Sequence, residues 1–197
     1  NGVLLVSEDV ECTSTALTYF AAALQQGADL VVCDAVFGYD GGSALYQTDQ
    51  HLPGQRCALL SRALLDRCRA AARGKDDVLE LLRLANQLAQ NCRCVPQALL
   101  HFRRELCAED VFSATGKRAV VLSHELTMTG APIVLVSAVP VLRSMGYEVV
   151  VLGPEDGGSM PLFLEAGATV ITRKGCVQSP LLWGLALCAD LVLANTV

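Results

Sequence analysis

The clearest hydrophobic pattern lies in the C-terminal part of the chain. Residues 119–122 are uniformly apolar, which predicts a buried strand, and a longer apolar stretch that opens at Thr129 and Gly130 predicts a helix. Gly146 marks the end of this helix, and residues 148–152 predict a second strand. Strand, helix and strand in this order predict a βαβ unit. Such units build parallel sheets whose ligands bind at the carboxyl ends of the strands.

The N-terminal part alternates in a similar way. Apolar runs at residues 3–6 and 29–34 predict two strands, and an amphipathic helix is predicted between them at 13–25. The further elements predicted are a long loop at 37–53, helices at 57–72 and 76–89, a strand at 92–95, and a helix begun by Pro96 that runs from 97 to 110.

The two patterns differ enough to predict a division of the chain. Residues 113–116 form a short polar break between charged helical sequence and an all-apolar strand. We therefore expect an α/β protein with Rossmann-like parallel sheets and flanking helices. It would consist of two partial domains, residues 1–112 and 117–197, joined by a linker at 113–116.

Composition narrows the function classes. Of 197 residues, 52% are hydrophobic, which is enough for a sizeable core, and no apolar run reaches the ~18 residues of a membrane span. The net charge of −5 argues against a nucleic-acid partner. Because the chain begins with Asn1 and residues 2–6 already predict a core strand, we expect it to begin inside a domain, without a signal peptide.

The cysteine spacing and the lack of two phosphate-binding motifs argue against several further classes of protein. The nine cysteines lack the paired C-x-x-C spacing of a zinc site, and several lie in apolar runs, so we expect reduced structural thiols in a cytoplasmic protein. No G-x-G-x-x-G follows a predicted strand, which argues against a dinucleotide-dependent dehydrogenase. The absence of G-x-x-x-x-G-K-[ST] argues against an NTPase.

Polar and glycine-bearing turns follow the predicted strands of the second part. Ser123-His124 follow the first strand, Thr129-Gly130-Ala131-Pro132 open the helix, and Asp156-Gly157-Gly158 follow the second strand. Together with the later runs E-A-G-A-T-V and A-D-L-V-L-A-N-T, in this order, they resemble the N-terminal domain of family 4 glycosyltransferases, which are retaining, two-domain GT-B enzymes.

This resemblance implies a nucleotide-sugar donor and a glycan or lipid-linked acceptor. The residues it implies in substrate binding are His124, Thr129, Gly130 and Asn195. A helix N-terminus suits a phosphate because its N–H groups point outward. No cofactor is expected in residues 117–197.

Four runs of the first part resemble the second half of a family 2 glycosyltransferase, an inverting enzyme of the GT-A fold. They are the strand and acidic loop V-L-L-V-S-E-D, the strand G-A-D-L-V-V-C-D, the helix start K-D-D-V-L-E-L-L-R, and V-P-Q-A-L-L-H-F-R-R. The resemblance implies Asp77 as the general base and Asp9 as the last carboxylate of a site for Mn²⁺ or Mg²⁺, with His101 near the metal. Ser7 stands where the first metal carboxylate would be, so this site is degraded or reshaped.

Plainer structural roles remain open for most of these residues. Asp77 at a helix start is an ordinary partner of the helix dipole. Asp9 is equally well a surface carboxylate, and His101 a packed or solvated histidine. Thr129-Gly130 could be a turn and helix cap with no ligand, and His124 a polar loop residue.

These observations lead to one functional hypothesis and two rivals. We expect a fragment of a tandem glycosyltransferase for cell-surface polysaccharide synthesis, with little activity alone and no nucleic-acid partner. The resemblance also allows peripheral membrane association of the parent protein. The first rival is a non-catalytic α/β scaffold or interaction module of transferase ancestry. The second is a flavodoxin-like domain that binds a small molecule.

Overall fold

The computed structural model describes residues 2–39, 42–47, 56–74, 77–104, 106–113, 116–176 and 180–195. The first part forms β1 (Gly2–Val6), β2 (Val10–Cys12), α1 (Ala16–Gln25), β3 (Leu30–Tyr39), β4 (Gly42–Gln47), β5 (Cys57–Ser61), α2 (Arg62–Ala72), α3 (Val78–Leu88), β6 (Cys92–Phe102) and α4 (Ala108–Val111). The second part forms β7 (Lys117–Ser123), α5 (Gly130–Ser144), β8 (Tyr147–Gly153), α6 (Met160–Glu165), β9 (Thr169–Thr172), α7 (Pro180–Leu187) and β10 (Leu191–Asn195).

The second part is a parallel sheet in the order β9-β8-β7-β10. Numbered along the chain this is 3-2-1-4, the order in which a Rossmann fold begins. Alternate residues of β7 are buried on opposite faces of the sheet. Ala119 and Val121 pack in one cluster with α5 and α6, whereas Val120 packs in another with α7. The predicted α/β class with Rossmann-like sheet and flanking helices is thereby confirmed.

Helix α5 follows the sequence expectation closely. It begins at Gly130, and its apolar face, which includes Leu135 and Val139, packs on β7 and β8. It ends before Gly146, whose φ of +85° is a left-handed conformation that a glycine adopts without strain. This glycine turns the chain directly into β8.

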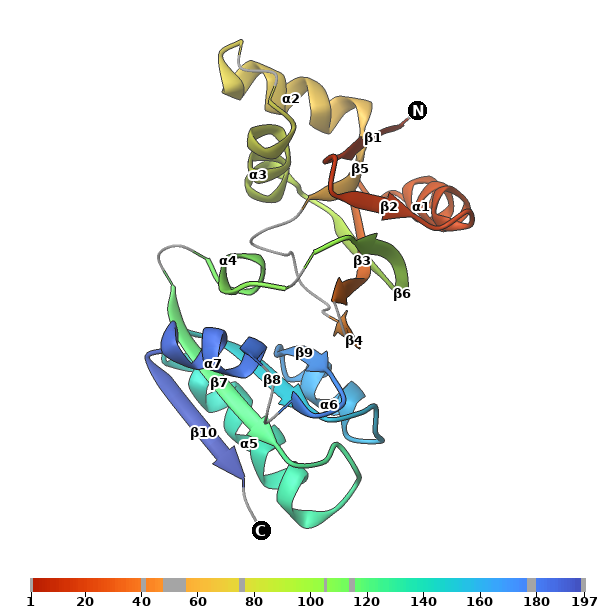
Figure 1. The fold of residues 1–197 in the computed structure, drawn as a ribbon. Helices are drawn as coiled ribbons and strands as arrows, with labels where there is room; N and C mark the ends of the chain where they lie inside the picture. The colour runs from red at the N-terminus through yellow and green to blue at the C-terminus, as the bar shows by residue number, and fades with distance from the viewer. Residues whose placement is uncertain are drawn as a thin grey trace.

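The first part is a mixed sheet covered on both faces. Strand β3 pairs antiparallel with β4 and β5 and parallel with β6, while β1 pairs with β5 and β2 with β6. Figure 1 shows α1 on one side of this sheet and α2 with α3 on the other. Leu30 and Val32 are buried under α2 and α3, and Val31 and Cys33 are buried with α1.

Three predicted elements of the first part were wrong in whole or in part. Residues 37–39 belong to β3 and residues 42–47 to β4, which pairs antiparallel with β3, instead of a loop; residues 40, 41 and 48–55 lie outside the described residues. The helix predicted at 57–72 is present only from Arg62 to Ala72, as α2. Residues 57–61 form β5 instead, since a short buried strand has the same apolar run as a helix. The helix begun by Pro96 is strand β6; Pro96 lies at the register shift between Cys33 and Asp34, where a missing N–H is tolerated.

The sheet continues from the first part into the second. Strand β4 pairs antiparallel with β9, placing Tyr46 opposite Ile171. One buried apolar cluster includes Phe37 and Phe112 from the first part together with Ile171 and Leu185 from the second. The division at 113–116 stays a prediction from sequence, whereas the structure shows that the two parts share one sheet and one core cluster.

Among the helices within the described ranges, none combines the length and apolarity that crossing a bilayer requires.

Candidate functional site

The carboxyl ends of β7 and β10 lie side by side where the strand order reverses. Asn195, the last residue of β10, is in register with Ser123, the last residue of β7. The helix after β7 packs on one face of the sheet and the helix before β10 on the other. A crevice outside such a switch point is where open α/β sheets bind their ligands. The predicted residues His124 and Asn195 are therefore at the same edge.

A glutamate organises the loop after β7. The Oγ1 of Thr129 donates a hydrogen bond of 2.6 Å to Oε1 of Glu125, and Thr127 Oγ1 lies 3.2 Å from Thr129 Oγ1. His124 Nε2 lies 3.6 Å from Glu125 Oε1, and both side chains are exposed by about a third. Hydrogen bonds from Thr129 and Thr127 hold the pKa of Glu125 below its usual value. The sequence interpretation missed Glu125, although the acid between His124 and T-x-T signals it.

The same loop leads directly into the N-terminus of α5. Thr129 occupies the N-cap position, but its side chain makes no capping hydrogen bond because the hydroxyl bonds to Glu125. A Cβ added to Gly130 would meet nothing within 4 Å, so the start of the helix opens onto free space. The first N–H groups of a helix lack intrahelical partners and carry partial positive charge. Thr129 and Gly130 therefore offer a hydroxyl and a helix terminus at the strand edge.

Gly153, the last residue of β8, and Gly157, in the turn after it, pack against this loop. A Cβ added to Gly157 would lie 2.1 Å from the carbonyl oxygen of Leu126, and one added to Gly153 would lie 2.6 Å from the Leu126 side chain. The N–H of Ser159 donates to the same Leu126 oxygen at 2.9 Å. The Asp-Gly-Gly run after β8 thus holds the β7 loop in place through backbone contact.

Asp9 lies in a cluster of arginines. Its Oδ2 accepts from Arg104 Nε at 2.8 Å and lies 3.7 Å from Arg56, while Ser7 donates to Oδ1. Partial burial raises the pKa of Asp9, but the hydrogen bonds from Ser7 and Arg104 outweigh burial and leave this pKa below its ordinary value. The Asp9 carboxylate is thus already neutralised within the fold.

His101 lies on β6, opposite Glu11 of β2. Its ring covers Gly38, where an added Cβ would lie 2.9 Å from His101 Nε2. Within the described ranges, no group of three or more His, Cys, Asp or Glu is arranged to hold a metal ion. Two arginines beside Asp9 are also the wrong surroundings for a cation. The donor set does not fit a divalent metal, and metal binding by Asp9 and His101 stays a prediction from sequence.

Asp77 caps a helix. Its Oδ2 accepts from the N–H of Glu80 at 3.0 Å, and its backbone is extended, as at an N-cap. The neighbouring Asp76 lies outside the described residues. The geometry shows a structural role for Asp77 and leaves its role as a base a prediction.

The capping role can be measured. Asp77→Ala should lower the free energy of unfolding by about 1 kcal/mol, because the Glu80 N–H loses its acceptor at the start of α3. Asp77→Ser keeps a capping oxygen and should retain most of this stability in urea denaturation. Equal losses in both variants would contradict the capping role.

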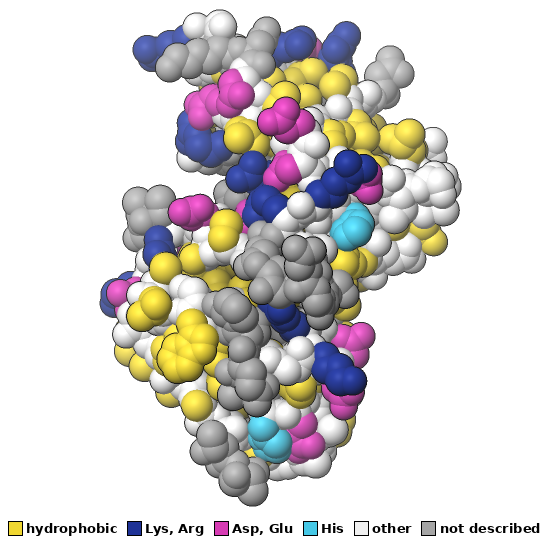
Figure 2. Space-filling model, in the orientation of Figure 1, with side chains coloured by type: hydrophobic (Ala, Val, Ile, Leu, Met, Phe, Trp, Pro, Cys, Tyr) yellow, Lys and Arg dark blue, Asp and Glu magenta, His cyan; other side chains and the backbone are white. Residues whose placement is uncertain are grey.

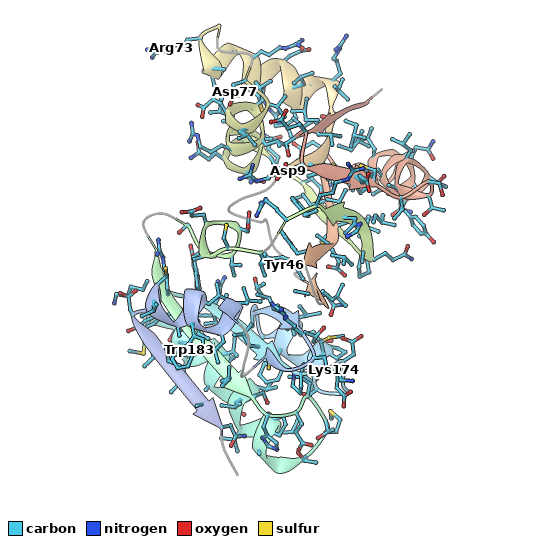
Figure 3. All side chains as sticks on the ribbon, in the orientation of Figure 1. Asp9, Tyr46, Arg73, Asp77, Lys174 and Trp183 are labelled. Carbon is cyan, nitrogen blue, oxygen red and sulfur yellow. The ribbon has the colours of Figure 1, made fainter. Side chains whose placement is uncertain are left out.

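The residues predicted in the two parts do not form one site. Asp9 and Asp77 lie in the upper half of Figure 3, while β7 and β10 end at the lower edge of Figure 1. On the face drawn in Figure 2, basic and acidic side chains lie beside one another over the upper part, without an extended stripe of one sign.

Comparison with known proteins bears on the second of these two regions. Residues 115–197 match the family described as Glycosyl-transferase family 4. This family 4 part contains the whole β7–β10 unit and the strand edge of His124 and Asn195. The match supports glycosyltransferase ancestry and, in general, a nucleotide-sugar donor and an acceptor as partners. The chain matches no curated protein and no solved structure. The family 2 resemblance of residues 1–112 stays a prediction.

Proposed function

We propose that this chain is part of a cytoplasmic glycosyltransferase that moves a sugar from a nucleotide donor to a glycan or lipid-linked acceptor, in cell-surface polysaccharide synthesis. Peripheral membrane association of the parent protein belongs to the same proposal. The observation that carries it is the switch point between Ser123 and Asn195, which lies beside the N-terminus of α5 inside the family 4 part.

The chemistry of this edge suits a sugar and a phosphate. Glu125 accepts hydrogen bonds from hydroxyl groups, as it already does from Thr129, and sugar hydroxyls are the same kind of donor. The Asn195 amide both donates and accepts, and His124 adds a ring nitrogen beside the carboxylate. Gly130 leaves room for a phosphate oxygen near the helix N–H groups.

Residues 1–112 contribute less to catalysis in this proposal. Asp9, the carboxylate expected to hold metal, is bound by Arg104 and lies beside Arg56, and Asp77 caps α3. These contacts favour a second candidate for this part, a non-catalytic scaffold of transferase ancestry. We accordingly expect the 197-residue chain to turn over little or no donor by itself.

Nuclear magnetic resonance can test the site. Titrating the ¹⁵N-labelled chain with UDP and with GDP should shift the amide signals of residues 124–130 and Asn195. A His124→Ala, Asn195→Ala double variant should weaken this binding at least about fivefold, since two polar contacts of about 0.5–1.5 kcal/mol each are lost. Ser137→Ala, on the exposed side of α5, is the matched control and should bind as the parent does.

Three outcomes would contradict the proposal. Shifts confined to the first part would move the nucleotide site away from the family 4 part. No shift at the strand edge with millimolar UDP or GDP would favour the scaffold, and a response to flavin alone would favour a flavodoxin-like binder.

A further inference from the structure

Two cysteines far apart in the sequence meet in the first part of the fold. Cys12 ends the short strand β2 and Cys57 begins β5, and their Sγ atoms lie 3.9 Å apart. Cys57 is buried, whereas Cys12 is partly exposed. All nine cysteines lie within the described residues, and none of them forms a disulfide.

We propose that Cys12 and Cys57 are a redox-active pair that a peroxide converts into a reversible disulfide. A disulfide needs its sulfurs about 2 Å apart, so the two Sγ atoms must approach by about 2 Å. Strand β2 is three residues long and pairs with β6 alone among the described strands, so a shift there breaks few ladder hydrogen bonds. The backbone of β5 can stay in place between β1 and β3.

The chemistry balances with one peroxide molecule. The sulfur of Cys12, the more accessible of the two, attacks a peroxide oxygen, the O–O bond breaks, and Cys12 becomes a sulfenic acid with release of water. The Cys57 sulfur then attacks the Cys12 sulfur, the S–O bond breaks, and a second water leaves. Two thiols thus lose two electrons and two protons to one hydrogen peroxide.

Burial explains the order of these steps. It raises the pKa of Cys57 far above that of an ordinary thiol, so this buried group is a poor first nucleophile and acts as the resolving thiol. Cys33 belongs to the same core cluster, and burial raises its pKa to about 12. Because both thiols are buried, the pKa does not distinguish them; Cys57 is assigned as the resolving thiol because its Sγ lies 3.9 Å from that of Cys12.

The crosslink would join two segments that also carry charge contacts. Arg56 directly precedes Cys57 and lies 3.7 Å from Asp9, three residues before Cys12. A covalent link between β2 and β5 restricts the unfolded chain over 45 residues. The oxidised protein should therefore unfold at a higher temperature than the reduced protein.

Peptide mapping tests the pair directly. The chain is treated with hydrogen peroxide, alkylated and digested without reductant; a peptide linking Cys12 to Cys57 is expected, and dithiothreitol should abolish it. Cys188→Ser removes an exposed thiol and should leave the crosslink intact, whereas Cys57→Ser should leave Cys12 as a sulfenic acid trapped by dimedone. The Tm of the wild-type chain should rise on oxidation and return on reduction.

Peptide mapping of the oxidised wild-type chain can overturn the inference without any variant. If Cys188 is oxidised while Cys12 and Cys57 are both recovered as alkylated thiols, the pair is inert. A peptide that links Cys12 to Cys33 would show that the wrong partner was assigned.

Discussion

Arg104→Ala should lower the free energy of unfolding by about 3–5 kcal/mol, the range for removing one partner of a buried ion pair. Arg104 donates two hydrogen bonds of 2.6 Å to the carboxylate of Asp110 and a third, of 2.8 Å, to Asp9. The side chain of Asp110 is only 5% exposed. Without Arg104 this carboxylate would stay buried, and among the described residues its remaining basic neighbour would be Arg56, at 3.9 Å.

Aromatic packing adds to the expected loss. The guanidinium carbon of Arg104 lies 5.5 Å from the ring centre of Phe37 and 5.4 Å from that of Phe102. The two rings are themselves stacked, with centres 4.3 Å apart. Since cation–π contacts of this kind contribute about 0.5–2 kcal/mol, the alanine variant loses packing as well as charge.

An exposed pair of the same chemistry provides the control. Arg83 also makes two hydrogen bonds to one carboxylate, that of Glu80 on the same helix, but its side chain is 52% exposed. Arg83→Ala should therefore leave the midpoint of urea denaturation nearly unchanged, because solvent-exposed pairs add little. Equal destabilisation by the two variants would show that burial of the Asp110 site does not matter.

The same cluster predicts how acid affects stability. Burial raises the pKa of Asp110, but the hydrogen bonds from Arg104 and Cys107 outweigh burial and lower this pKa below its ordinary 3.8. The resulting stability is complete above that value and is lost as the pH falls below it, through the lowered pKa of the folded state. Arg104→Ala should flatten this acid limb in denaturation curves measured below pH 4.

The second part could be predicted from sequence because its signals are local. Apolar runs define β7 and β8, Gly146 ends α5, and topology rules then place the carboxyl ends of parallel strands at one edge. That is why His124 and Asn195, 71 residues apart, could be assigned to the same region. The hydrogen bonds of Glu125 depend on side-chain geometry, which the residue pattern does not contain.

The first part was predicted less well because contacts between residues distant in sequence determine its secondary structure and its ion pairs. Residues 97–102 have helix-like sequence, yet they form β6 because β3 and β2 supply its ladder partners on both sides. Asp9 fits a metal motif by position, but its actual partner is Arg104, 95 residues later. A sequence motif reports which groups are available, and only the fold determines which charges neutralise them.

Gly157→Ala should have the second large effect, a loss of about 1–3 kcal/mol of folding free energy together with displacement of the candidate binding loop. The added Cβ would lie 2.1 Å from the Leu126 oxygen, and backbone on both sides must move to relieve this contact. The hydrogen bond from Ser159 N–H to the same oxygen would be lost. Chemical denaturation and the amide spectrum of residues 124–130 measure the two effects.

A substitution at a second glycine serves as a control. It distinguishes a local clash at Gly157 from a general loss of stability on replacing glycine by alanine. Gly184 lies in α7, and a Cβ there would meet nothing within 4 Å, so Gly184→Ala should be neutral or stabilise the helix by about 0.5–1 kcal/mol. If Gly157→Ala retained the parent stability and the parent spectrum of the β7 loop, the contact between Gly157 and Leu126 would not be what holds that loop. A stable variant with a shifted loop and weaker UDP or GDP binding would instead tie the Asp-Gly-Gly turn directly to the proposed site, because Leu126 is the neighbour of Glu125.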